Sequence, residues 1–175
     1  MNTDLLYQLA LTQVPNIGAV HARQLTDALG SAEAIFKAKK STLEKIEGIG
    51  EVRAKSIKAF DAFKEQEAEI SFIEKYKIKP LFLTDEDYPK RLLHCYDPPT
   101  LLFYRGNANL NHTKIISIIG TRSNTDYGKQ MTEKILAALQ PLQPLVISGL
   151  AYGIDAIAHK FCVKQQLSTV GVLAH

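Results

Sequence analysis

The second half of the chain alternates short apolar runs with helix-like stretches, and this alternation constrains the fold more than any other feature. The run KIISII at 114–119 is continuous, rich in isoleucine and closed by Gly120, which is typical of a strand buried in a parallel sheet. The segments after it are predicted to be helix, strand, helix and strand in turn: 126–140, 144–148, 154–166 and 168–174. This order predicts an α/β fold with an open, doubly wound parallel sheet.

The predicted sheet has three strands, which is small for a parallel sheet. The last strand ends in VLAH, and no helix follows it to cover the sheet. We therefore expect residues 79–175 to be the N-terminal portion of a domain that is truncated here.

The first 78 residues carry a different pattern, with apolar residues at spacings of three and four. This periodicity predicts a small all-helical domain. The pattern changes near residue 79, and short strand candidates then appear at 81–83 and 101–105. The sequence therefore predicts two domains, residues 1–78 and 79–175.

Local signals place some helix starts in the first domain. Ser31 follows a glycine and is predicted to cap a short helix. Ser41, with Glu44 three residues later, is predicted to begin another helix as a capping box. Residues 51–76 are predicted to be largely helical.

The helical part contains one internal repeat, in which VPNIGAVHARQL (14–25) aligns with IEGIGEVRAKSI (46–57). The two copies resemble tandem helix-hairpin-helix motifs, in which backbone N–H groups at a helix N-terminus can hold a DNA phosphate. The first copy departs from the pattern because Asn16 stands where the second has Gly48. Contact with duplex DNA or with another protein through residues 46–57, or a purely structural pair of hairpins, stay open as alternatives.

Composition excludes several classes of protein. Apolar residues make up 46% of the 175 residues and charged residues 22%, enough to bury a core and unlike a disordered chain. No apolar run reaches 18 residues and the N-terminus lacks a secretion signal, so we expect no membrane contact and a cytoplasmic location. The two cysteines, Cys95 and Cys162, suggest neither a disulfide framework nor a zinc site.

The charge is unevenly distributed. The net charge is +3, and residues 1–78 hold 11 basic and 11 acidic side chains, whereas residues 79–175 hold 10 and 7. This mild balance permits a polyanionic partner without requiring one, and such a partner would be expected on the second domain.

The loop after the first buried strand carries the first group of candidate binding residues. Gly120 allows a sharp turn, and Thr121, Arg122 and Ser123 follow it at the carboxyl end of the strand, the edge where open α/β sheets bind ligands. Arg122 can pair bidentately with a phosphate. The loop has neither the GxGxxG dinucleotide fingerprint nor the GK[ST] of a Walker loop.

The segment SGLAYGIDAIAH (148–159), after the second strand, supplies the second group. The amides of Gly153, Ile154 and Asp155 are predicted to be free at a helix N-terminus and to form an anion site. The candidates in this segment are Ser148, Gly149, Gly153, Ile154, Asp155 and His159.

No catalytic or metal-binding set emerges from these loops. We expect His159 to be a hydrogen-bonded support of the loop rather than a base, and Ser148 lacks the GxSxG context of a nucleophile. Asp155 and His159 are too few ligands for a metal. The sequence holds no row of alternating basic and aromatic residues for base stacking, and Tyr127 and Tyr152 are the only candidates near the loops.

Together, these segments resemble the DNA-processing protein A family, DprA or Smf. The matching motifs are YP at 88–89, DPP at 97–99, FYRG at 103–106, IIGTR at 118–122, Tyr127-Gly128, SGLAYGID with AIAH at 148–159 and TVGVLAH at 169–175. The resemblance implies an extended Rossmann-like sheet preceded by a SAM-like helix-hairpin-helix domain. It also implies single-stranded DNA binding, loading of RecA recombinase in natural transformation and recombination, a homodimer, and no cofactor.

The resemblance assigns roles to residues of both loops. Gly120, Thr121 and Arg122 match the family's first phosphate-binding loop, and the residues that match the second are Ser148, Gly149, Gly153, Asp155 and His159. The family's dimer and RecA contacts would lie mostly beyond position 175. An alternative is a Rossmann-like enzyme that cleaves the N-glycosidic bond of a nucleoside monophosphate. A further alternative is a helical interaction module carried on a scaffold sheet.

Overall fold

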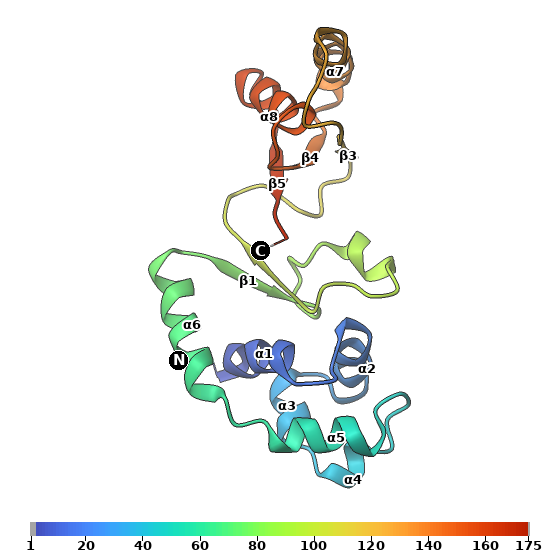
Figure 1. Cartoon of the computed structure of the whole chain (residues 1–175), viewed down its shortest axis with the longest axis vertical. Coiled ribbons are helices and arrows are strands. Elements are labelled where there is room, and N and C mark those ends of the chain that lie inside the picture. Colours follow the sequence, from blue (N-terminus) through green and yellow to red (C-terminus); the bar gives the residue numbers. More distant parts are fainter. Residues whose placement is uncertain (1–2, 175) are drawn as a thin grey trace. The chain divides into compact units, whose positions relative to one another are not determined.

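The computed structural model describes residues 3–174 (Figure 1). The chain forms two compact units, the first through Gly106 and the second from Asn107. The expected boundary at residue 78 marks the end of the helical segment, whereas the first unit continues through a short β-hairpin. His175 of the motif at 169–175 lies outside the described residues.

Six helices make up most of the first unit: α1 (Thr3–Gln13), α2 (Ala19–Leu29), α3 (Ala32–Lys37), α4 (Lys40–Leu43), α5 (Gly50–Ala59) and α6 (Phe63–Lys75). Ser31 caps α3 as predicted, since its hydroxyl accepts a hydrogen bond from the Ala34 amide at 3.1 Å. The capping box at Ser41 is wrong, because α4 already begins at Lys40 and Ser41 lies inside it.

An aromatic cluster explains why the stretch predicted to be helical from 51 to 76 is broken. Phe60 leaves α5 with an extended backbone, and its ring packs edge-on against Phe63 at 5.4 Å between centroids. Both rings also lie against Phe36 of α3, at 5.9 and 5.6 Å. Tyr7 of α1 completes the cluster, at 5.6 Å from Phe36. Packing among these half-buried rings therefore favours the turn between α5 and α6.

The two hairpins of the internal repeat share an unusual backbone conformation. Asn16 has φ +68 and the equivalent Gly48 has φ +80, and asparagine is among the few residues that tolerate this region. The departure at Asn16 therefore preserves the hairpin. Arg53 ties the hairpins together, donating from Nε to the Asn16 carbonyl at 3.2 Å and from Nη1 to the Gly48 carbonyl at 3.0 Å.

The segment after α6 forms an antiparallel hairpin of β1 (Lys79–Phe82) and β2 (Leu101–Tyr104), with a 3-10 turn η1 (Lys90–His94) between them. Tyr88 is fully buried there, and its hydroxyl donates to the Pro99 carbonyl at 2.7 Å. Burial of the phenol raises the pKa of Tyr88 to about 12.

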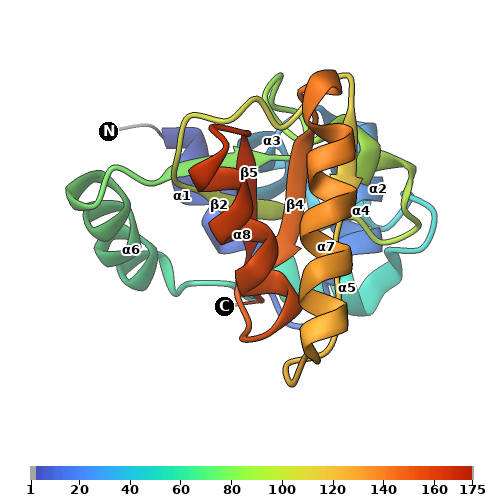
Figure 2. The same cartoon turned by 90° about the horizontal axis from the view of Figure 1, so that it is seen from above.

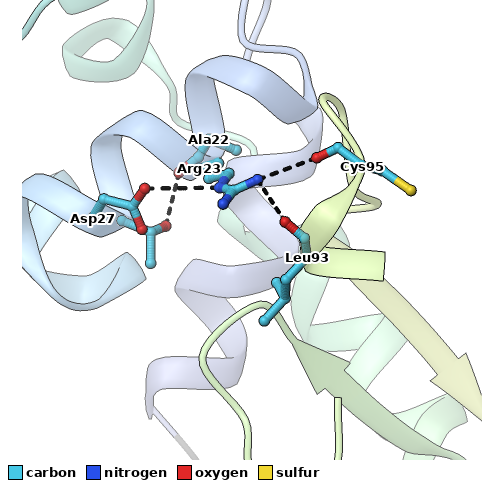
Figure 3. A network of polar contacts seen from close by, with 6 residues as sticks. Ala22, Arg23, Asp27, Leu93 and Cys95 are labelled. Carbon is cyan, nitrogen blue, oxygen red and sulfur yellow. Dashed lines mark hydrogen bonds and ion pairs between the residues drawn. The ribbon is translucent and has the colours of Figure 1, made fainter. Parts of the chain in front are cut away.

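A second arginine attaches this segment to the helices. Nη1 of Arg23, on α2, donates to the carbonyls of Leu93 and Cys95 at 2.9 and 3.2 Å (Figure 3). Its Nε lies 3.8 Å from an Asp27 carboxylate oxygen. These long-range contacts help to explain why residues 79–106 belong to the same compact unit as the helices.

The second unit follows the predicted alternation. Its elements are β3 (Ile115–Ser117), α7 (Asp126–Leu139), the 3-10 turn η2 (Gln140–Leu142), β4 (Leu145–Gly149), α8 (Ile154–Lys164) and β5 (Thr169–Val172). The strands are parallel in the order β3-β4-β5, with Ile116 opposite Val146 and Val146 opposite Thr169. The parallel α/β fold is confirmed.

The helices of this unit lie on the same face of the sheet. Figure 2 shows α7 and α8 side by side over β4 and β5. A doubly wound sheet carries helices on both faces because its strand order reverses. In residues 3–174 the order does not reverse, so the doubly wound expectation is not met there. The core under the helices consists of Leu136, Val146, Ala158, Cys162 and Leu167, with Ile116 and Ile118 packed against it.

Candidate nucleic-acid interface

Two loops meet at the carboxyl edge of the parallel sheet. The first loop (118–125) follows β3 and the second loop (150–153) follows β4. The Ile154 amide donates to the Thr121 carbonyl at 3.1 Å, and a Cβ on Gly153 would stand 2.1 Å from that same oxygen. The backbones of the two loops are therefore in direct contact.

Two glycines make this contact sterically feasible. Gly153 has φ +82, and a Cβ there would also lie 2.6 Å from the Arg122 carbonyl oxygen. A Cβ on Gly120 would lie 2.5 Å from Cγ1 of Ile154, whose side chain is buried between the loops. Gly153 therefore allows a close backbone approach to the first loop of the same chain.

Ser148 and His159 form hydrogen bonds at the strand ends from which the two loops leave. The Ser148 hydroxyl donates to the Ile118 carbonyl at 2.6 Å, and the side chain is buried. His159 Nε2 lies 2.8 Å from the Gly149 carbonyl, which can only accept, so Nε2 carries a hydrogen. Nδ1 of the same ring lies 2.8 Å from the Thr169 hydroxyl. Both ring nitrogens of His159 are therefore within hydrogen-bond distance of the sheet, one at the end of β4 and one on β5.

The start of α8 differs from the predicted anion site. The Ile154 amide is already bonded to Thr121, so the prediction that it is free is wrong. Asp155 is buried, and its Oδ1 has no hydrogen-bond partner in the described residues. Its Oδ2 lies so close to Gly149 that a Cβ added there would stand 2.6 Å from it. This carboxylate adds negative charge to the same helical turn, where it competes with an anionic ligand.

The exposed polar groups belong to the first loop. Gly120, Thr121, Arg122 and Ser123 are all exposed, and no ion-pair partner of Arg122 occurs among residues 3–174. The Ser123 amide donates to the Thr121 hydroxyl at 3.2 Å, which shapes the loop beside the guanidinium. A ligand at this edge would therefore meet the polar groups of the first loop and the exposed side chains of Leu150 and Tyr152 in the second.

The second unit also carries the whole charge excess. Residues 107–175 hold six lysines and arginines against three acidic residues, while residues 1–106 hold fifteen of each. The positive potential predicted for the second half is therefore concentrated in the unit that contains the two loops.

Four large apolar or aromatic side chains lie exposed around the loops: Ile119, Tyr127, Leu150 and Tyr152. Ile119 was expected in a buried strand, but β3 ends at Ser117 and Ile119 is 79% exposed. Periodicity cannot locate the end of a continuous apolar run, so the exposure of Ile119 could not be predicted from the pattern.

The first unit offers a second candidate surface along α5. A hollow of about 720 Å³ is lined in part by Glu51, Val52, Lys55 and Ser56, which belong to the predicted contact segment 46–57. Arg53 of the same segment uses its guanidinium to donate hydrogen bonds to the Asn16 and Gly48 carbonyls of the hairpins. Residues 3–174 contain no cluster of three side chains suited to hold a metal.

Paired hairpins followed by a parallel sheet with interlocked glycine loops define a helix-hairpin-helix protein with a Rossmann-like unit. The model of the SAM-like helix-hairpin-helix tandem matches residues 9–60, and the model of DNA recombination-mediator protein A matches residues 79–175. The chain therefore belongs to the DNA recombination-mediator protein A family, which confirms the resemblance.

Individual relatives agree with this assignment. The chain is 35% identical over 179 residues to Protein Smf of Synechocystis, covering 98% of this chain and 44% of that protein. It is 36% identical over 98 residues to DNA processing protein DprA of Bacillus subtilis, covering 55% of this chain and 33% of that protein. The chain thus spans less than half the length of these two curated relatives.

A solved structure shares the fold. The X-ray structure of DNA processing protein A from Streptococcus pneumoniae superposes with a TM-score of 0.62 at 24% identity, covering 95% of this chain and 56% of that one. The match supports the order of a helical unit followed by a parallel α/β unit.

Proposed function

We propose that this chain binds single-stranded DNA at the edge formed by the two loops. The exposed guanidinium of Arg122 carries the proposal, because it lies on the exposed first loop of the positively charged unit. The proposed contacts are to the sugar-phosphate chain and are independent of sequence. Gly120, Thr121, Arg122 and Ser123 make them, while Ser148, Gly149, Gly153, Ile154, Asp155 and His159 hold the loops in shape.

We further propose that the protein is not catalytic. Both ring nitrogens of His159 and the hydroxyl of Ser148 are engaged in internal hydrogen bonds, which removes the obvious base and nucleophile. The names of the family and its relatives support a role in DNA processing and recombination. A role in natural transformation, the loading of RecA, a homodimer and a cytoplasmic location belong to the same proposal for the whole protein.

A salt-dependent binding titration tests the DNA-binding proposal. Fluorescence anisotropy would compare labelled single-stranded and duplex oligonucleotides at two salt concentrations, since each phosphate contact steepens the salt dependence. Arg122→Ala should weaken single-strand binding by about 1–3 kcal/mol. Lys134→Ala, which removes one exposed charge from the same unit at the middle of α7, is the matched control.

The outcomes separate the alternatives. Equal affinity of wild type and Arg122→Ala would refute the site, and release of free base from a nucleoside monophosphate would favour the enzymatic alternative. If the duplex binds best, and binding is lost on changing Lys55, the contact belongs to the helical segment 46–57. RecA assembly on a protein-coated single strand, with and without the whole protein, tests the loading role.

No helix within residues 3–174 combines the length and the apolarity that crossing a membrane requires.

A further inference from the structure

Tyr127 and Tyr152 are the most exposed aromatic side chains of the second unit. Residues 107–175 contain three aromatic residues, Tyr127, Tyr152 and Phe161. Phe161 packs against the core, whereas Tyr127 is 71% exposed and Tyr152 85% exposed. Large rings that lie in water carry an apolar surface without a partner in the described structure.

Both tyrosines directly precede glycines that pack against the two loops or the start of α8. Tyr152 directly precedes Gly153, which packs against the carbonyl oxygens of Thr121 and Arg122. Tyr127 is the second residue of α7 and directly precedes Gly128, whose Cβ position lies 3.7 Å from Cδ1 of Ile154. Each ring is therefore attached to the backbone next to the interlocked part of the two loops.

We infer that Tyr127 and Tyr152 stack on nucleobases of the single strand whose phosphates Arg122 contacts. This inference rests on the proposed function. A phosphate contact by one guanidinium does not distinguish single strands from duplexes, because both carry the same phosphates. Exposed rings do distinguish them, because duplex bases are already stacked and paired, whereas those of a single strand can stack on protein. Ile119 and Leu150, 79% and 57% exposed, add apolar surface that a stacked base would cover.

The test compares two strands that differ in their bases alone. One is oligothymidylate, and the other is a strand of the same length made of abasic tetrahydrofuran units with the same phosphates. The 175-residue chain should bind oligothymidylate more tightly by about 5- to 150-fold for each base stacked. Arg122→Ala should weaken binding to both strands by the same factor and leave this preference intact.

Variants of the tyrosines assign the preference to the two rings. The double change of Tyr127 and Tyr152 to alanine should abolish the preference for bases, and the double change to phenylalanine should retain it. Tyr96→Ala is the matched control, since Tyr96 is 82% exposed and belongs to the first unit. Circular dichroism would verify that the double alanine variant folds; if it does not, the two-strand comparison on the wild-type chain still decides.

Each outcome has a distinct meaning. Equal affinity of the wild-type chain for both strands overturns the stacking inference and leaves the phosphate proposal standing. A base preference that survives in the double alanine variant also overturns it. Binding to neither strand overturns the proposed function together with the inference, and a second protein bound by these rings would then be the alternative occupant.

Discussion

Replacing Gly153 by alanine perturbs the close backbone contact between the first loop and the second loop. The residue has φ +82 and ψ −130, a region that residues with a Cβ rarely adopt. The new methyl carbon would lie 2.1 Å from the Thr121 carbonyl oxygen and 2.6 Å from that of Arg122. Both neighbours are backbone atoms, so relief requires the loops to move apart.

The cost follows from two separate contributions. The backbone conformation costs a residue with a Cβ about 1–2 kcal/mol. Separation of the loops breaks the hydrogen bond from the Ile154 amide to the Thr121 carbonyl, and a buried group left unpaired costs about 1–3 kcal/mol. Gly153→Ala should therefore destabilise the second unit by about 2–5 kcal/mol.

Gly30→Ala is the matched control, because Gly30 also has a positive φ, +86, but nothing lies within 4 Å of its Cβ position. It should cost the first unit about 1–2 kcal/mol, the conformational part alone. Hydrogen exchange measured by mass spectrometry across a urea series reads the free energy of unfolding of each unit. Equal losses in the two variants would show that loop contact does not contribute, and a stable Gly153→Ala variant would refute the geometry.

Three further changes test separate parts of the structure. Tyr88→Phe removes the hydrogen bond to Pro99 and should cost about 1–2 kcal/mol. In addition, because the folded pKa of Tyr88 is about 12 against 10.0 in the unfolded chain, wild type should lose stability from pH 10 upward and this variant should lack that component. Burial and the nearby Arg53 charge lower the pKa of His21 below 6.5, so stability should fall as pH drops below 6.5, and His21→Gln should flatten that slope in urea titrations. Ser148→Ala leaves the Ile118 carbonyl without its donor and should lower the thermal midpoint, with a loss of about 1–3 kcal/mol; an unchanged midpoint would contradict the role assigned to that hydroxyl.

Much of the second unit could be predicted because its apolar runs are short and separated by glycines. β4 was expected at 144–148 and is found at Leu145–Gly149, and α8 was expected from 154 and begins at Ile154. The face on which each helix lies could not be predicted, since it depends on strand order rather than on any local pattern. The extent of the first unit depends on a similar kind of contact: Arg23 donates to carbonyls 70 and 72 residues away in the chain.

The candidate site could be located from the sequence, but its residues could not be sorted by role. Glycines, a serine and a histidine after two strands are equally compatible with contacting a ligand and with supporting a loop. Burial decides between these roles: Ser148 turns inward to the Ile118 carbonyl, whereas Ser123 lies exposed. The occupied amide of Ile154 shows the same limit, because its acceptor, the Thr121 carbonyl, is 33 residues earlier in the sequence (154 − 121).

The division between supporting and exposed residues has a measurable consequence for the proposed function. Residues that lock the loops, such as Gly153 and Ser148, affect affinity by way of the fold, so their variants should lose stability and DNA binding together. Arg122 is exposed and has no ion-pair partner in residues 3–174, so its variant should lose DNA binding alone. If Arg122→Ala lowers the free energy of unfolding as much as Ser148→Ala does, the guanidinium supports the loop rather than contacting a phosphate, and the proposed interface loses its principal charge.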